Sequence, residues 1–181
     1  NHNDNIGLRL TLTRTTALTT VIMLRVLLYY RICCFGARHE LGTKRYTFIK
    51  VANIVLDGPD NFESRFEINK ACVECHKPLI SAAVIRFEGQ ISVFKGYEVD
   101  QPCYQCLYSE DGNGRESCVE NGVLAPVAGL VGTIQALQAI KVLLGLGEQL
   151  CGELLLIDGL DLSFRKVKIV KDSECPICSL N

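Results

Sequence analysis

The chain has 181 residues, of which 48% are hydrophobic and 22% are charged, and its formal net charge is -1. This length predicts one domain or two small ones, with a core large enough to fold without disulfide bonds. The composition is typical of a globular protein and excludes collagenous, coiled-coil and disordered chains. The near-zero charge argues against nucleic acid as a partner and against binding to anionic membranes.

Charge and threonine content both change near residue 50. Residues 1–50 carry eight Lys and Arg against two acidic residues, whereas residues 51–181 carry eleven against eighteen. Eight of the nine threonines also lie in the first fifty residues. We therefore expect two segments: residues 1–50, artefactual or disordered and outside the domain, and residues 51–181, which form it.

An apolar run within the first segment, residues 17–35, needs its own interpretation. It is interrupted by Arg25 and Arg31, and each central Arg costs about 2.5–3.5 kcal/mol in a membrane-spanning helix. A signal peptide would need a small-residue cleavage site, which is not evident. A buried helix or strand, or sequence foreign to the domain, remain the alternatives, and we favour the last.

In the second segment the elements follow one another regularly. Residues 51–58 form an apolar, β-branched run that predicts a buried strand ending in a turn. A helix capped by Asp60 or Asn61 should follow and end at Pro78. Its expected buried positions are Phe62, Phe66, Ile68, Ala71, Cys72 and Cys75, and its expected wet positions are Glu63, Arg65, Glu67 and Lys70.

Two strands are expected next, separated by a turn at Glu88 and Gly89, which completes a strand–helix–strand unit of an α/β fold. A polar, glycine-rich stretch, residues 108–117, predicts a long loop. The second helix should run from Pro126 to Gly145, with a polar edge that disfavours a membrane span and small residues that allow close packing. Residues 152–159 and 163–170 predict a final hairpin. The polar edge is Gln135, Gln138 and Lys141, and the small residues are Gly129, Gly132, Ala136 and Ala139.

Six of the ten cysteines form pairs with Cys-x-x-Cys spacing, which places two thiolates on one zinc ion through a tight turn. Two pairs lie in predicted turns and supply a complete structural site: Cys103, Cys106, Cys175 and Cys178. A redox pair or free surface thiols are the alternatives for these four. Cys72 and Cys75 fall inside the predicted helix, where packing explains them better. This usage indicates a reducing compartment, and we expect the cytoplasm.

Cys118 stands apart in the predicted loop. Nearby Arg115 and the following helix N-terminus could both lower the pKa of its thiol. A reactive thiol and an incidental loop cysteine are both open at this point. Cys33, Cys34 and Cys151 are interpreted as packing residues.

Several motifs in order then become recognisable as a set. The segments LDGPDNFESRFEIN, KPLISAAVIRFEGQISVF, PCYQCL, SCVENGVLAPVAGLVGTIQALQAIKVL, GELLLIDG and ECPICS closely resemble the C-terminal two-thirds of the ThiF/MoeB/HesA family. These proteins are bacterial relatives of the ubiquitin-activating enzymes. The resemblance covers about residues 51–179 and implies a Rossmann-like α/β sheet with a four-cysteine zinc site.

The resemblance implies an adenylyltransferase that uses ATP and Mg²⁺. Such enzymes activate the C-terminal glycine of a ubiquitin-like sulfur-carrier protein for thiamine or molybdopterin synthesis, and a homodimer is implied. Asp60 matches the family's Mg²⁺ and phosphate ligand, with Asn61, Arg65 and Asn69 as nearby nucleotide-binding positions. Cys118 matches a cysteine that some members use in a thioester or persulfide step. The four zinc cysteines match one for one.

The sequence departs from the family in its first part. Residues 1–50 contain no GxGxxG loop to hold the nucleotide, and Pro59 replaces a threonine of the family motif. The first βαβ unit is therefore expected to be missing, the ATP site incomplete, and the chain truncated and inactive as given. The alternative is a non-catalytic, zinc-stabilised module for carrier binding or dimerisation. A thiol-redox protein and an NAD-dependent oxidoreductase fit less well.

Overall fold

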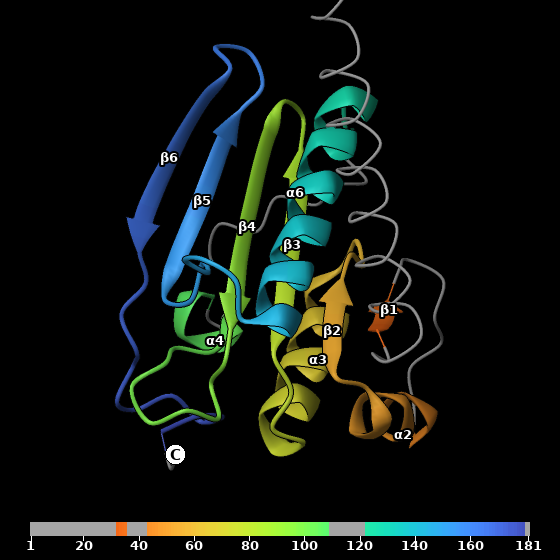
Figure 1. The fold of residues 1–181 in the computed structure, drawn as a ribbon, viewed down its shortest axis with the longest axis vertical. Helices are drawn as coiled ribbons and strands as arrows, with labels where there is room; N and C mark the ends of the chain where they lie inside the picture. The colour runs from red at the N-terminus through yellow and green to blue at the C-terminus, as the bar shows by residue number, and fades with distance from the viewer. Residues whose placement is uncertain (1–31, 36–42, 109–121, 180–181) are drawn as a thin grey trace, which may run out of the picture. The chain divides into compact units, whose positions relative to one another are not determined.

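Six strands form one mixed sheet in which the spatial order of the strands equals their order in the chain (Figure 1). The computed structural model describes residues 32–35, 43–108 and 122–179, all within one unit, Ile32–Asn181. The strands are β1 (Ile32–Phe35), β2 (Ile54–Asp57), β3 (Leu79–Ile85), β4 (Glu88–Phe94), β5 (Glu153–Asp158) and β6 (Ser163–Lys168). The helices are α2 (Thr43–Val51), α3 (Phe62–Glu74), α4 (Tyr104–Leu107) and α6 (Ala125–Leu144).

The sheet has a parallel part and an antiparallel part. Strands β1, β2 and β3 pair in parallel, and α3 provides the crossover between β2 and β3. Strands β3 to β6 pair antiparallel, and β5 and β6 form the expected C-terminal hairpin. The predicted strand–helix–strand unit and the mixed α/β class are therefore confirmed.

Helices cover both faces of the sheet, α6 on one and α3 on the other (Figure 1). Side chains alternate between faces along a strand, so neighbouring residues enter different cores. Val55 and Leu79 pack with Ile68 of α3, whereas Ile54 and Ile80 pack in a second cluster with Val131 of α6.

Two elements, β1 and α2, begin before residue 51, where the composition changes. Strand β1 pairs along its length with β2, from Ile32↔Ile54 to Phe35↔Asp57, and α2 contributes the buried Ile49 to the core beside α3. Strand β2 begins at Ile54 and not at Val51, because α2 continues through Val51 and Ala52 N–H still donates to Phe48 O at 3.1 Å. Residues 1–31 lie outside the described part of the chain.

The turn between β3 and β4 falls at Arg86 and Phe87 and not at Glu88 and Gly89 as expected. Gly89 lies inside β4, where a Cβ atom would overlap Val131 of α6. Its role is therefore close approach of the helix and not a turn. Of the small residues expected to permit close packing on α6, Ala139 is buried in the core, whereas nothing lies within 4 Å of a Cβ built on Gly129 or Gly132.

Among the described residues, α6 is the one helix whose length and composition could cross a membrane, with mean hydropathy 1.7 over its most apolar window. Only 22% of that window is buried, and Leu137 is 53% exposed. Gln138 of the expected polar edge is buried and accepts from Leu150 N–H at 3.3 Å, and Gln135 donates to backbone oxygens of β2 and β3. The polar edge thus contributes to packing of α6 on the sheet.

Candidate functional site

The carboxyl end of β2 leads directly into the start of α3. Asp57 is the last residue of β2, and Gly58 and Pro59 form the turn before Asp60. Asn61 is the N-cap of α3, because its Oδ1 accepts from Ser64 N–H at 2.8 Å. Asp60 is exposed and accepts from Asn61 Nδ2 at 3.3 Å. Because Asn61 caps the helix, the Asp60 carboxylate is not needed for capping. It is exposed to solvent and could accept a cation.

Arg65 lies in a buried network behind this turn, although the sequence pattern placed it on the wet face of α3. Its guanidinium donates to Asp57 Oδ2 at 3.1 Å, to Ser81 Oγ at 3.3 Å and to Ala82 O at 3.0 Å. The side chain is only 8% exposed and that of Asp57 is 0% exposed. These bonds hold the guanidinium against β2 and β3.

Asp57 is the acceptor at the centre of the network. Its Oδ1 accepts from Ala82 N–H at 3.1 Å and its Oδ2 accepts from Ser81 Oγ at 3.2 Å. Burial raises the pKa of the Asp57 carboxyl above its usual range, whereas the charge of Arg65 and the hydrogen bonds from Ala82 and Ser81 oppose that rise. The network therefore joins β2, α3 and β3 behind the Asp60 turn.

Gln135 of α6 contacts the end of β2 from the face of the sheet opposite to α3 (Figure 1). Its Nε2 donates to Asp57 O at 2.7 Å and to Ile80 O at 2.9 Å, so it joins the last residue of β2 to the second residue of β3. Sequence reasoning placed Gln135 on a polar edge and gave it no such role. An amide on an otherwise apolar helix was the available signal, because buried amides require partners.

Four cysteine sulfurs converge at the other end of α3. Their Sγ atoms lie within 4.8 Å of one another, with 3.6 Å between Cys103 and Cys175 and 3.4 Å between Cys106 and Cys178. Three of the residues are buried, and Cys106 is partly buried. The two predicted Cys-x-x-Cys pairs are thus brought together, although they are 72 residues apart in the chain.

The spacing of these sulfurs fits a tetrahedral zinc ion. Zn–S bonds of about 2.3 Å put the corners of a tetrahedron about 3.8 Å apart, and the shortest observed separations are 3.4 to 4.0 Å. The hydrogen bond with Cys103 lowers the pKa of Cys106 to about 5. Burial raises the pKa of Cys178 to about 12. The hydrogen bond between Cys106 and Cys103 also raises the pKa of the Cys103 thiol. The convergence of the four sulfurs, and not the pKa of any one thiol, is therefore what fits a zinc ion.

Asn69 lies beside this cluster and away from the Asp60 turn. Its Oδ1 accepts from Tyr104 N–H at 3.0 Å and its Nδ2 donates to Cys103 Sγ at 3.5 Å. The expected nucleotide-binding positions thus separate in the structure: Asp60 and Asn61 lie at the turn, Arg65 in the network, and Asn69 at the cysteines.

The other described cysteines occupy the positions that packing predicts, except Cys34, which was expected to pack but is exposed on β1. Cys72 is 2% exposed within α3, and Cys75 packs against the same core. Cys33 packs there also, and Cys151 packs against the cluster beneath α6. Cys118 lies outside the described residues.

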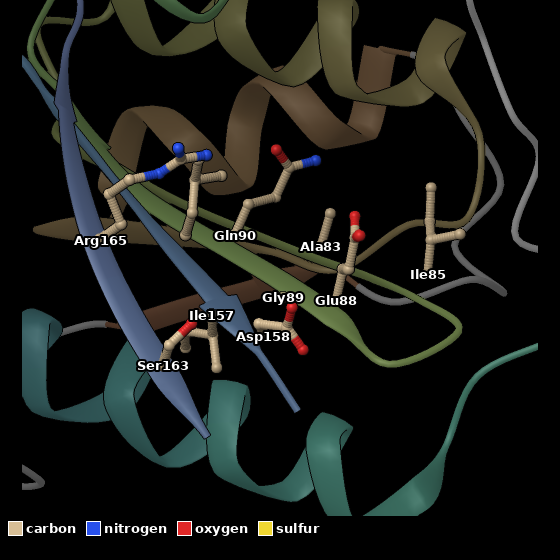
Figure 2. Close-up of a pocket in the computed structure, with 10 residues that line it drawn as sticks. Ala83, Ile85, Glu88, Gly89, Gln90, Ile157, Asp158, Ser163 and Arg165 are labelled. Atoms are coloured by element: carbon tan, nitrogen blue, oxygen red, sulfur yellow. The ribbon is translucent and has the colours of Figure 1, made fainter. Parts of the chain in front are cut away.

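A cavity of about 420 Å³ opens on the antiparallel part of the sheet (Figure 2). Figure 2 shows Arg165 and Gln90 pointing to the side of the sheet away from α6. Gln90 Oε1 accepts from Tyr108 Oη at 2.6 Å. None of the described residues expected to hold ATP, Mg²⁺ or zinc lines this cavity, so it is separate from both the Asp60 turn and the cysteine cluster.

Comparison with known proteins extends these observations. The ThiF family model matches residues 32–177, so the match begins before residue 51, where the recognisable motifs start. A molybdopterin-synthase adenylyltransferase of Haemophilus influenzae is 49% identical over 122 residues, which cover 67% of this chain and 50% of that protein. A sulfur carrier protein adenylyltransferase of Thermus thermophilus is 40% identical over 131 residues, covering 70% and 48%. The chain spans about half the length of these relatives.

Solved structures share the fold. The crystal structure of Escherichia coli MccB with ATP superposes with a TM-score of 0.60 and 19% identity over 78% of this chain and 44% of that one. The heterocyclase TruD gives a TM-score of 0.62 and 12% identity over 83% of this chain and 28% of that one. At such identities the likeness establishes the fold alone.

Proposed function

Because this chain belongs to the ThiF family, we propose that it forms part of an ATP-dependent adenylyltransferase for a ubiquitin-like sulfur-carrier protein of thiamine or molybdopterin synthesis. Relatives named as adenylyltransferases of molybdopterin synthase and of a sulfur carrier protein support this proposal. In the proposed reaction a C-terminal glycine carboxylate of the carrier attacks the α-phosphorus of ATP. The acyl-adenylate forms and pyrophosphate leaves.

The exposed Asp60 at the carboxyl edge of β2 is the observation that best supports this function. Ligands of open α/β sheets bind beyond the carboxyl ends of the strands. Asp60 would hold Mg²⁺, which when bound neutralises charge on the phosphates. The buried Asp57–Arg65 pair and Gln135 keep the end of β2 in place. Cys118 is proposed to act in sulfur transfer after adenylation.

The four-cysteine cluster is proposed to hold one structural zinc ion, since four thiolates leave no open coordination position for chemistry. Free thiols at every described cysteine agree with a reducing compartment, and we propose the cytoplasm. A thiol-redox protein is the competing interpretation. It fails if metal analysis finds about one zinc per chain and the four thiols resist alkylation.

Pyrophosphate exchange tests the proposed reaction. A longer version of the protein with a glycine-rich loop upstream should exchange labelled pyrophosphate into ATP when the carrier is present. The chain as given contains no GxGxxG loop, so little or no exchange is expected from it alone. Absence of exchange by the longer, zinc-loaded protein would overturn the proposal.

The second candidate is a non-catalytic module that binds the carrier or dimerises. The missing glycine-rich loop favours it, and exposed apolar residues on α6 such as Leu137 are compatible with a homodimer. Measurable carrier binding by this chain without affinity for ATP would support the module. Sedimentation of the same sample would measure whether it is a dimer.

A further inference from the structure

Asn69 is a buried amide whose two polar atoms are both engaged. It lies in the middle of α3 and is 1% exposed. Its Oδ1 accepts from Tyr104 N–H at 3.0 Å, and its Nδ2 donates to Cys103 Sγ at 3.5 Å. A buried amide of this kind is retained only when its partners satisfy it, so these contacts fix the side chain.

The orientation of the amide follows from its partners. The backbone N–H of Tyr104 can only donate, so the amide oxygen must face it. The NH₂ group is then directed toward Cys103 Sγ, which accepts. Cys103 is the N-cap of α4 and makes no side-chain capping bond, so its sulfur accepts from no backbone N–H at the start of that helix.

Distance separates Asn69 from the proposed nucleotide edge. Asn61 caps α3, and eight further residues place Asn69 about 12 Å along the helix axis from it at about 1.5 Å per residue. One side chain cannot reach a Mg²⁺–phosphate group at Asp60 while it donates to Cys103. Its chemistry therefore belongs to the cysteine cluster.

We propose that Asn69 is a positioning residue of the metal site, whose N–H···S bond orients the Cys103 thiolate and offsets its charge. Four thiolates around one Zn²⁺ carry a net charge of -2, so a neutral donor aimed at one sulfur stabilises the occupied site. Outer hydrogen-bond partners of metal ligands typically change affinity about 10–100-fold. This inference rests on the proposed zinc site and not on adenylation.

Two substitutions of Asn69 and one matched control test the proposal in the full chain. Asn69→Ala removes both bonds, whereas Asn69→Asp keeps an acceptor for Tyr104 but presents a carboxylate to the sulfur. Asn61→Ala also loses a side-chain bond of α3, to Ser64 N–H, without touching the cysteines. Zinc affinity is measured by competition with a chelator, and the thiolate-to-metal charge-transfer band is recorded after Co²⁺ replaces zinc.

Asn69→Ala should weaken zinc binding about 10–100-fold, and Asn69→Asp should weaken it at least as much. Both should shift the Co²⁺ charge-transfer band to lower energy, because the thiolate loses a donor. Asn61→Ala should leave affinity and band unchanged. If folded Asn69 variants keep wild-type zinc affinity and an unshifted band, the role of Asn69 is wrong but the metal site stands. If the wild-type chain binds no zinc, both the role of Asn69 and the metal site are wrong. Failure of both variants to fold in excess zinc also counts against it, since the amide would then be needed for the fold itself.

Discussion

The buried Asp57–Arg65 pair permits a quantitative prediction. Arg65→Met removes the guanidinium but keeps an apolar stem, which leaves the 1% exposed Asp57 without its cation. Removing one partner of a buried ion pair typically costs about 3–5 kcal/mol. That is a large part of a net stability of about 5–15 kcal/mol. Urea unfolding followed by circular dichroism, in the same zinc-containing buffer for every variant, measures the loss.

The loss should depend on pH in a direction fixed by Asp57. Burial raises the pKa of this carboxyl and Arg65 lowers it, so the substitution raises the folded-state pKa further above the unfolded value. A raised folded-state pKa favours the folded state at low pH and disfavours it as pH rises. The difference in unfolding free energy between wild type and Arg65→Met should therefore shrink from about pH 7 to about pH 5, by at most about 1.4 kcal/mol per pH unit.

Two further variants complete the experiment. Adding Asp57→Asn to Arg65→Met removes the unpaired charge and should recover part of the lost stability. Lys166→Met breaks the exposed pair with Glu153 (2.9 Å) and should have little effect, because solvent screens it. An equal loss at both pH values, or a double variant no more stable than Arg65→Met, would refute the claim that an uncompensated Asp57 causes the destabilisation.

Four other substitutions test the metal site, the Asp60 turn, Cys118 and the contact between α6 and β4. Cys175→Ser should lower zinc content from about one ion per chain and reduce the melting temperature; unchanged zinc by metal analysis would contradict the site. Asp60→Ala in the longer, loop-containing protein should abolish pyrophosphate exchange while leaving its melting temperature nearly unchanged. Cys118→Ala in the same protein should not reduce exchange. Loss of exchange in Cys118→Ala would contradict the proposal that Cys118 acts only in sulfur transfer. Gly89→Ala should cost about 1–3 kcal/mol because its Cβ overlaps Val131. Adding Val131→Ala should recover part of that loss in urea unfolding, and no recovery would point to another cause.

Local pattern was sufficient for most of the fold of residues 51–179. Short runs bounded by turn signals predicted β3 to β6, and the apolar stripe predicted α3 with Asn61 among its two possible caps. Strand β1 and helix α2 were not predicted, because the change in composition near residue 50 was taken as the boundary of the domain. Composition carries no information about which strands pair. Strand β1 is only four residues long, and its parallel partner β2 lies beyond an intervening helix.

The cysteine cluster could be predicted from sequence, because the spacing of its ligands along the chain is typical of a zinc site. Both Cys-x-x-Cys pairs came together as expected, because that spacing is itself a local geometric constraint. Arg65 and Asn69 could not be placed from sequence, since their partners lie on other elements. Ser81, Ala82 and Tyr104 become neighbours only after the sheet and α4 have packed around α3.

The cysteine cluster also has a consequence for the unfolded chain. Its two halves are 72 residues apart, and α6, β5 and β6 all lie in the segment between them. A metal that remained bound would close this segment into a loop and restrict the denatured ensemble. By analogy with a covalent cross-link, a loop of this length corresponds to a stabilisation of about 4.4 kcal/mol at most. The proposed zinc would then stabilise the second half of the sheet without contacting it, by reducing the number of conformations available when that half unfolds.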